Sequence, residues 1–188
     1  MKNLSLVLIL LLASINISQA QDTDFKKPIV HASKQNYSVT KIDSHIKTIR
    51  NLNNHLFKSK VGRIVSKNDH NPEISPRAAD VSIDKTILTQ IFYSTFSEKR
   101  LKQLADENLS ILIKFYTDPN GNVLELEFTF GDNSTLMPIE IEKLESQLQK
   151  NIKFSFKTDI FQGNTFAPLF YSVNFKRLVD HVPGAVYP

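Results

Sequence analysis

Residues 109–126 read LSILIKFYTDPNGNVLEL, and their pattern is the most informative about the fold. In the first half, apolar and more polar positions alternate, and a period of two predicts a β-strand. The DPNG segment at 118–121 is a turn signal, because Pro fixes one φ angle and Gly accepts a positive one. A second alternating run follows, with an apolar face made of Leu124, Leu126, Phe128 and Phe130. The stretch predicts a β-hairpin with one buried side and one solvated side.

Two carboxylates, Glu125 and Glu127, lie on the polar face of this hairpin, roughly 7 Å apart by the rise of a strand. Such a pair is compatible with two-carboxylate hydrolysis. A solvated sheet face, with the carboxylates paired to Lys114 and Lys176, shows the same alternation without any activity. The solvated face is the favoured interpretation, and no residue is assigned a catalytic role.

Downstream, a helix is predicted over 138–150. Pro138 suits the first helical position, and the segment is acidic at its start and ends on Lys150, as the helix dipole favours. A strand is predicted over 166–177. Its inward positions, at every second residue, are Leu169, Tyr171, Val173 and Phe175. Residues 179–188 are expected to form a C-terminal tail.

Upstream, helical spacing of apolar residues indicates two short helices or one kinked helix within 83–107, with Ser97 as an N-cap. Isoleucines and leucines at steps of three and four also predict a helix over 42–57. Residues 58–80 contain Pro72 and Pro76 and read as a linker. The sequence thus predicts an N-terminal arm at 21–80 and an α+β domain at 81–178. We expect a largely antiparallel sheet of three or four strands with the 138–150 helix packed on one face and the 83–106 helices nearby.

The first twenty residues have the pattern of a secretory signal peptide. Lys2 precedes the apolar run LVLILLLA at 6–13, which is shorter than the ~20 residues that a membrane span needs. Small residues at Ser18 and Ala20 predict cleavage between Ala20 and Gln21. Because the chain has no cysteine for lipid attachment, we expect a periplasmic or secreted protein without a membrane span after cleavage.

Composition narrows the function classes further. The absence of cysteine excludes disulfides, thiolate zinc sites and cysteine nucleophiles. The five histidines form no i, i+4 ligand pair, and the five glycines form no phosphate-binding loop, so neither a metal nor another cofactor is expected. A formal net charge of +4, which loses one unit with Lys2, is too small to indicate nucleic-acid binding.

The order of hairpin, helix and long strand over 109–178 resembles the C-terminal domain of the TonB family. The residues that carry the resemblance are the strand, DPNG turn and strand at 111–126, the helix at 141–151, Lys153-Phe154, and Val173-Asn174-Phe175 in the closing strand. The chain also looks like the small secreted proteins common in Bacteroides-type bacteria.

That resemblance implies a non-catalytic protein-interaction module of the cell envelope. Its binding residues would lie on an open edge strand formed by Leu169, Tyr171, Val173, Asn174 and Phe175. The expected partner is an envelope protein or an extended peptide, held by main-chain hydrogen bonds. The alternatives are a secreted hydrolase that uses Glu125 and Glu127, and a structural accessory protein.

Overall fold

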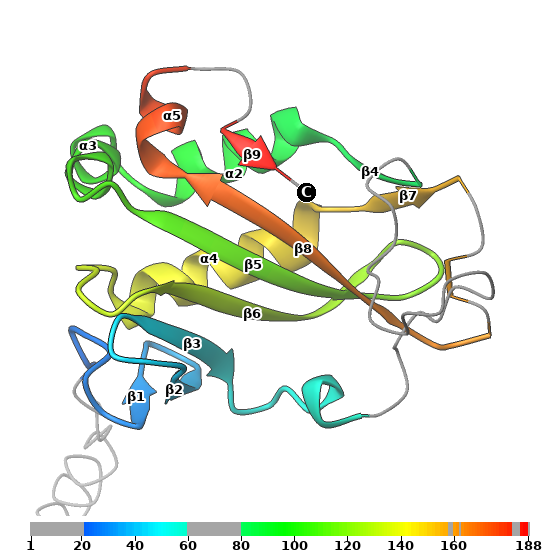
Figure 1. Ribbon diagram of the computed structural model, residues 1–188, viewed down its shortest axis with the longest axis horizontal. Helices are drawn as coiled ribbons and strands as arrows, with labels where there is room; N and C mark the ends of the chain where they lie inside the picture. The colour runs from blue at the N-terminus through cyan, green and yellow to red at the C-terminus, as the bar shows by residue number, and fades with distance from the viewer. Residues whose placement is uncertain (1–20, 60–79, 158–159, 162, 182–184, 188) are drawn as a thin grey trace, which may run out of the picture.

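The computed structural model describes residues 21–59, 80–157, 160–161, 163–181 and 185–187. Its centre is an antiparallel sheet with the strand order β1-β2-β3-β6-β5-β8-β9 (Figure 1). The strands are β1 (Ile29–His31), β2 (Asn36–Lys41), β3 (Ile46–Asn51), β5 (Ser110–Thr117), β6 (Val123–Gly131), β8 (Ala167–Asn174) and β9 (Val186–Tyr187). Two further strands, β4 (Val81–Ile83) and β7 (Phe154–Phe156), pair in a separate small sheet. The predicted α+β class is therefore confirmed.

The predicted hairpin is present as β5 and β6. Ile113 pairs with Phe128 and Phe115 with Leu126, so apolar side chains of both strands share one face. That register follows from the alternation in the sequence, because a slip of one residue would move every side chain to the other face. Gly121 ends the turn with φ +82°, which is the left-handed conformation expected of it.

The helices lie on one face of the sheet, which we call the inner face; the opposite one is the outer face (Figure 1). They are α2 (Lys85–Thr95), α3 (Glu98–Asp106), α4 (Pro138–Asn151) and α5 (Phe175–Val179). A 3-10 turn, η1 (Leu56–Lys58), follows β3 and is not part of this layer. Asp84 and Ser97 cap α2 and α3 by accepting backbone N–H groups of the first turn. Both upstream helices and the 138–150 helix are thus confirmed.

The hydrophobic core lies between the sheet and these helices. α4 contacts β6, and α2 packs on α4. Fully buried side chains from both layers meet there: Leu88, Phe92, Leu104, Ile111, Ile113, Phe115, Leu126, Leu144 and Leu148. Burial of such side chains is the main favourable term in folding. β8 lies beside β5 in this layered structure, and its inner residues complete the core.

The helix predicted over 42–57 is wrong. This region forms β3 and η1, and it joins the sheet between β2 and β6. The residues of the apolar stripe do not share a buried face, since Ile42 is 62% exposed and Leu52 48% exposed. Within β3, burial instead extends to both faces of the strand, at Lys47, Thr48, Ile49 and Asn51. The pairing of β3 with the edge of β6 decides the conformation, and local spacing cannot report such a pairing.

The sheet also extends beyond the predicted domain boundaries. It begins at Ile29 instead of after residue 80, and Phe25 in the expected arm is buried against Phe130. At the other end, β9 pairs with β8 and so brings part of the predicted tail into the sheet. The result is seven strands where three or four were expected.

The signal peptide predicted over 1–20, its cleavage site and most of the linker predicted over 58–80 lie outside the described residues. Within the described part of the chain, no helix combines the length and the apolar character needed to cross a membrane.

Candidate functional site

β8 is the strand that the sequence singled out, and its backbone groups alternate between two sides. The N–H of Phe175 donates to the carbonyl of Leu109 beside β5 at 3.0 Å, whereas the N–H of Asn174 donates to the carbonyl of Ala185 at 3.0 Å on the opposite side. In an antiparallel strand this alternation continues along the chain. Residues 169, 171 and 173 therefore turn their N–H and C=O groups to β5, and residues 168, 170 and 172 turn theirs to the outward edge.

One half of the outward edge is occupied by the chain itself. Ser172 pairs with Tyr187 and Val173 with Val186, in antiparallel register. The edge is therefore competent to add a strand by main-chain hydrogen bonds. Together with the bond from Asn174 to Ala185, this pairing covers residues 172–174.

The other half of the edge has no strand partner among the described residues. By the alternation, Phe170 presents an outward N–H and an outward C=O there. Pro168 presents only a carbonyl, because it has no N–H, and proline is tolerated in a sheet at such an outward edge position. Phe170 is 38% exposed, and the Lys114 ammonium lies 5.6 Å from the centroid of its ring.

The residues predicted to bind a peptide differ in their location and in their contacts. Leu169, Tyr171 and Val173 are buried on the inner face, so they hold β8 in place and do not face a ligand. Phe175 is not part of the strand, because it begins α5 and packs edge-on against Phe92 and Phe96, each at 5.6 Å between ring centroids. Asn174 caps α5 by accepting the N–H of Arg177, and its own N–H is taken by Ala185.

The outward-facing residues Pro168 and Phe170 were missed by the sequence analysis. The signal for them was present, since they lie at the alternate positions of the same strand. Strand addition uses the backbone groups at these outward positions. The prediction from the sequence instead chose mainly the apolar positions, on the basis of their side chains.

The opposite edge of the sheet is closed at His31 of β1. Its N–H donates to the Asp22 carboxylate at 2.9 Å, and its carbonyl accepts the N–H of Asp22 at 2.8 Å. Such covering is one way in which proteins protect edge strands from unwanted pairing. At His31 the β1 edge is thus covered, whereas Phe170 of β8 has no strand partner among the described residues.

The solvated face predicted for Glu125 and Glu127 is wrong, since they are only 6% and 5% exposed. Glu125 accepts the N–H of His55 and the N–H of Leu56, at 2.9–3.1 Å. It therefore anchors the segment that enters η1 on the outer face. The sequence could not indicate this burial, because the covering segment is about seventy residues away in the chain.

Glu127 lies in a charged cluster on the same face. Its carboxylate forms an ion pair with Arg50 at 2.9 Å, accepts a hydrogen bond from the Tyr116 hydroxyl, and lies 3.8 Å from the Lys114 ammonium. Burial lowers the pKa of Lys114, and the nearby Glu127 charge opposes that effect. Both carboxylates thus have structural partners, and Lys176, which was expected to pair with them, lies on α5.

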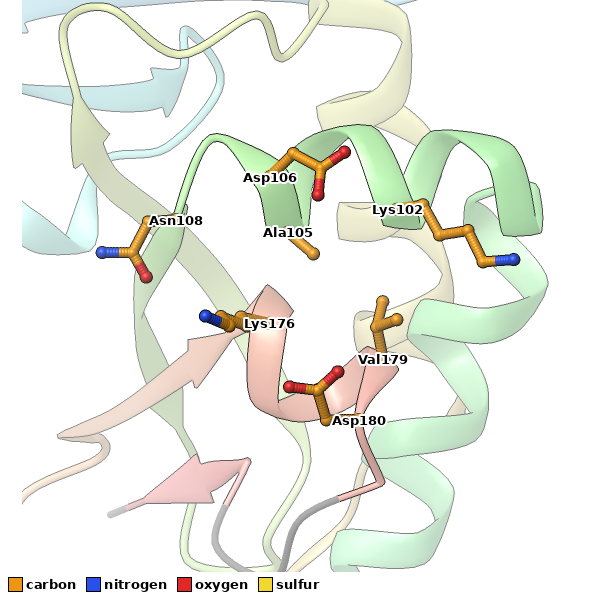
Figure 2. A pocket seen from close by; sticks show the side chains of 7 residues that line it. All are labelled: Lys102, Ala105, Asp106, Asn108, Lys176, Val179 and Asp180. Carbon is orange, nitrogen blue, oxygen red and sulfur yellow. The ribbon is translucent and has the colours of Figure 1, made fainter.

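A cavity of about 400 Å³ is lined by residues of α3 and α5 and by Asn108 and Asp180 beside them, and Figure 2 shows these side chains. Its polar rim carries two lysines and two aspartates, and Ala105 and Val179 contribute apolar atoms. The polar side chains that line it are all exposed, and Lys102 is paired with Glu98 at 2.7 Å. No buried polar group points into this cavity, so its lining does not define a ligand.

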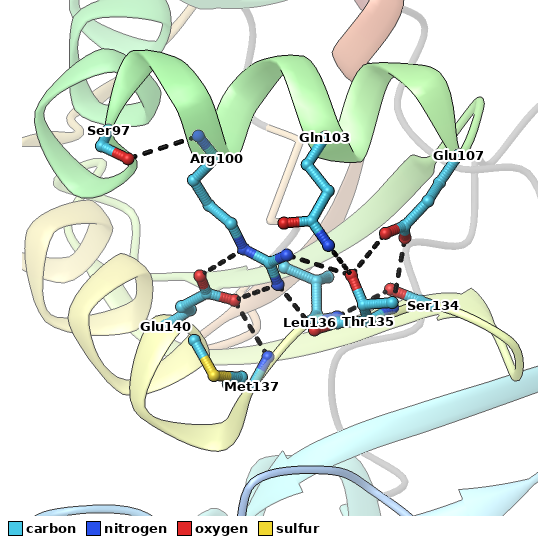
Figure 3. A network of polar contacts seen from close by, with 9 residues as sticks. All are labelled: Ser97, Arg100, Gln103, Glu107, Ser134, Thr135, Leu136, Met137 and Glu140. Carbon is cyan, nitrogen blue, oxygen red and sulfur yellow. Dashed lines mark hydrogen bonds and ion pairs between the residues drawn. The ribbon is translucent and has the colours of Figure 1, made fainter.

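Figure 3 shows a polar network that joins α3 to the start of α4. Arg100 binds both oxygens of Glu140, at 2.7 and 2.9 Å, and also donates to the carbonyl of Thr135 at 2.6 Å. Glu140 accepts the N–H of Met137 as well. The hydrogen bond to Glu140 raises the pKa of Arg100. Because Arg100 and Glu140 are bonded to each other in this way, their ion pair has a structural role, and we call it the Arg100 clamp.

No metal centre can be assembled from the residues that the structure describes, because nowhere do three His, Asp or Glu side chains gather as ligands. His70 lies outside these residues.

No family model matches this sequence. No curated protein matches it. Among solved structures, the chain is similar to the crystal structure of a DUF5043 family protein from Bacteroides uniformis, with 17% identity and a TM-score of 0.63. The alignment covers 82% of this chain and 95% of that chain. The likeness supports the Bacteroides-type part of the expectation at the level of the fold, and the resemblance to the TonB C-terminal domain is not confirmed.

Proposed function

We propose that the chain is an exported protein-interaction module that captures an extended peptide by adding it as a strand to the outward edge of β8. The observation that most supports this proposal is β9, a segment that already adds to the edge in antiparallel register. Main-chain hydrogen bonds provide affinity in this mode of recognition. The proposed location in the periplasm or outside the cell rests on the leader sequence, and the proposed partner is an extended segment of an envelope protein.

The alternative of a two-carboxylate hydrolase has less support. A retaining or inverting mechanism needs one carboxyl group that donates a proton and another that acts on the substrate or on water. Glu125 is tied to backbone N–H groups and Glu127 to Arg50, so both already hold parts of the fold together.

Peptides selected from a displayed random library against the intact protein would test the proposal. We expect Phe170→Pro to weaken their binding by about tenfold or more, because it removes the outward N–H of the open edge. Phe170→Ala is the matched control, since it removes the ring but keeps the donor, and we expect it to bind within about threefold of the original protein. Circular dichroism establishes that both variants are folded.

Hydrogen exchange on the original protein gives a second readout that needs no substitution. Bound peptide should slow exchange of the Phe170 amide. Equal binding to the Pro variant, together with an unchanged exchange rate at Phe170, would reject the edge as the binding site.

A further inference from the structure

The open part of the β8 edge offers few hydrogen-bond donors to a peptide. Phe170 has an outward N–H, and Pro168 has none. The next outward donors are Ser172 and Asn174, and these lie along the stretch that β9 covers. A peptide confined to the open part would find one donor, whereas a peptide that also replaces β9 would find three. The second arrangement gives a run of main-chain bonds of the kind that strand addition uses.

We infer that an incoming extended peptide displaces β9 from the edge of β8. The peptide then pairs with β8 in the same antiparallel register as β9. This inference rests on the proposed function. It specifies how the ligand lies: it runs antiparallel to β8, with alternate N–H groups directed to the carbonyls of β8.

The pairing of β9 is small enough to be exchanged. β9 has two residues, and it is the last strand of the sheet, with β8 as its strand partner. Ala185, just before it, is half-buried and packs against the core. The residues of β9 and the residue before it are therefore paired with β8, but by few backbone hydrogen bonds.

A tethered occupant lowers the apparent affinity of any competing peptide. Its effective concentration is on the order of millimolar when the connection is short. If the β9 segment itself binds the empty edge with a dissociation constant of about 100 μM, this effective concentration weakens the binding of a free peptide about tenfold. A substitution that weakens the pairing of β9 with β8 should therefore raise the affinity for a free peptide, although β8 itself is unchanged.

The test uses two full-length variants and a fluorescein-labelled peptide of residues 180–188, DHVPGAVYP. By the alternation set by Asn174 and Ala185, the N–H of Tyr187 points to β8 and that of Val186 points away. Tyr187→Pro should therefore release the edge, and Val186→Pro is the matched control that adds a proline without removing a bond. Fluorescence anisotropy should show the peptide binding at least about fivefold more tightly to Tyr187→Pro than to the original protein.

Methylation of backbone nitrogens in the labelled peptide tests the register itself. N-methylation at the Tyr187 position should reduce binding to Tyr187→Pro by about tenfold or more, and N-methylation at the Val186 position should leave it unchanged. Equal binding to all three proteins, no binding to Tyr187→Pro, or equal effects of the two methyl groups would each overturn the inference.

The proposed function can fail separately from this inference. If library-selected peptides lose affinity for Phe170→Pro but bind Tyr187→Pro no better than the original protein, the edge is a binding site and β9 does not compete for it. If Phe170→Pro changes nothing, the proposed function itself is contradicted.

Discussion

Glu145 on α4 has a carboxyl group buried against β2 and β3. One oxygen accepts the Tyr37 hydroxyl at 2.7 Å and the Asn51 amide at 3.1 Å. The other oxygen has no hydrogen-bond partner among the described residues. Burial raises the pKa of Glu145, helped by the nearby charges of Glu142 and Glu125, while the two hydrogen bonds act in the opposite direction.

This raised pKa makes stability depend on pH in a definite direction. Between the ordinary value of 4.5 and the higher folded-state pKa, the folded chain binds more protons at Glu145 than the unfolded chain. Its contribution to stability is therefore present at low pH and is lost as pH rises through the folded-state pKa. Glu145→Gln cannot titrate. Urea unfolding should show that the variant gains stability relative to the original protein between pH 4 and pH 8, and a difference that does not change with pH would contradict this account.

A position can require glycine because its φ is positive or because a Cβ would clash with a neighbour. Gly121 and Gly163 allow these two causes to be distinguished. Both have positive φ, +82° and +84°. A Cβ on Gly121 would lie 2.0 Å from the Phe154 carbonyl oxygen, whereas a Cβ on Gly163 would meet nothing within 4 Å. Gly163→Ala should cost about 1 kcal/mol from backbone strain alone, and Gly121→Ala roughly 3 kcal/mol or more, because β7 must also move. Equal losses in chemical denaturation would exclude the contact with Phe154 as a cause.

At the scale of elements, the Arg100 clamp holds α3 to the start of α4. Arg100→Ala should lower the free energy of unfolding by about 2–3 kcal/mol, because it leaves the buried Glu140 carboxylate without its charged partner. Arg100→Lys should recover only part of this loss, since an ammonium cannot bind both oxygens in a planar pair. Lys102→Ala removes an exposed pair on the same helix and should change the free energy of unfolding much less. A similar loss for the two alanine variants would contradict the clamp.

The sequence correctly predicted the elements whose conformation depends on residues that are close together in the chain. The turn at 118–121 and the start of α4 at Pro138 carry residues whose backbone preferences decide the conformation in place. The 42–57 segment lacks such a signal, and its pairing with β6 decides its structure. Glu125 was misplaced for the same reason, because the segment that buries it comes from a distant part of the chain.

At the scale of the whole molecule, the candidate site depends on where the sheet ends. The sequence predicted β8, but whether β8 is a central or an outer strand depends on β9 and on the three strands that join at the other side of the sheet. The apolar residues of β8 were predictable from their period, and they prove to be core residues. In the proposed site, the groups that would face a peptide are backbone groups at Pro168 and Phe170. Their direction follows from the hydrogen bonds at Asn174 and Phe175, which the sequence does not reveal.

Amide hydrogen exchange of the free protein measures whether β8 presents an open backbone edge next to the segment that β9 covers. The Phe170 amide should exchange orders of magnitude faster than that of Tyr171, because the first points outward and the second donates to β5. The Asn174 amide, bonded to Ala185, should fall between them. Protection of Phe170 equal to that of Tyr171 would show that the edge is already closed, and it would contradict the account.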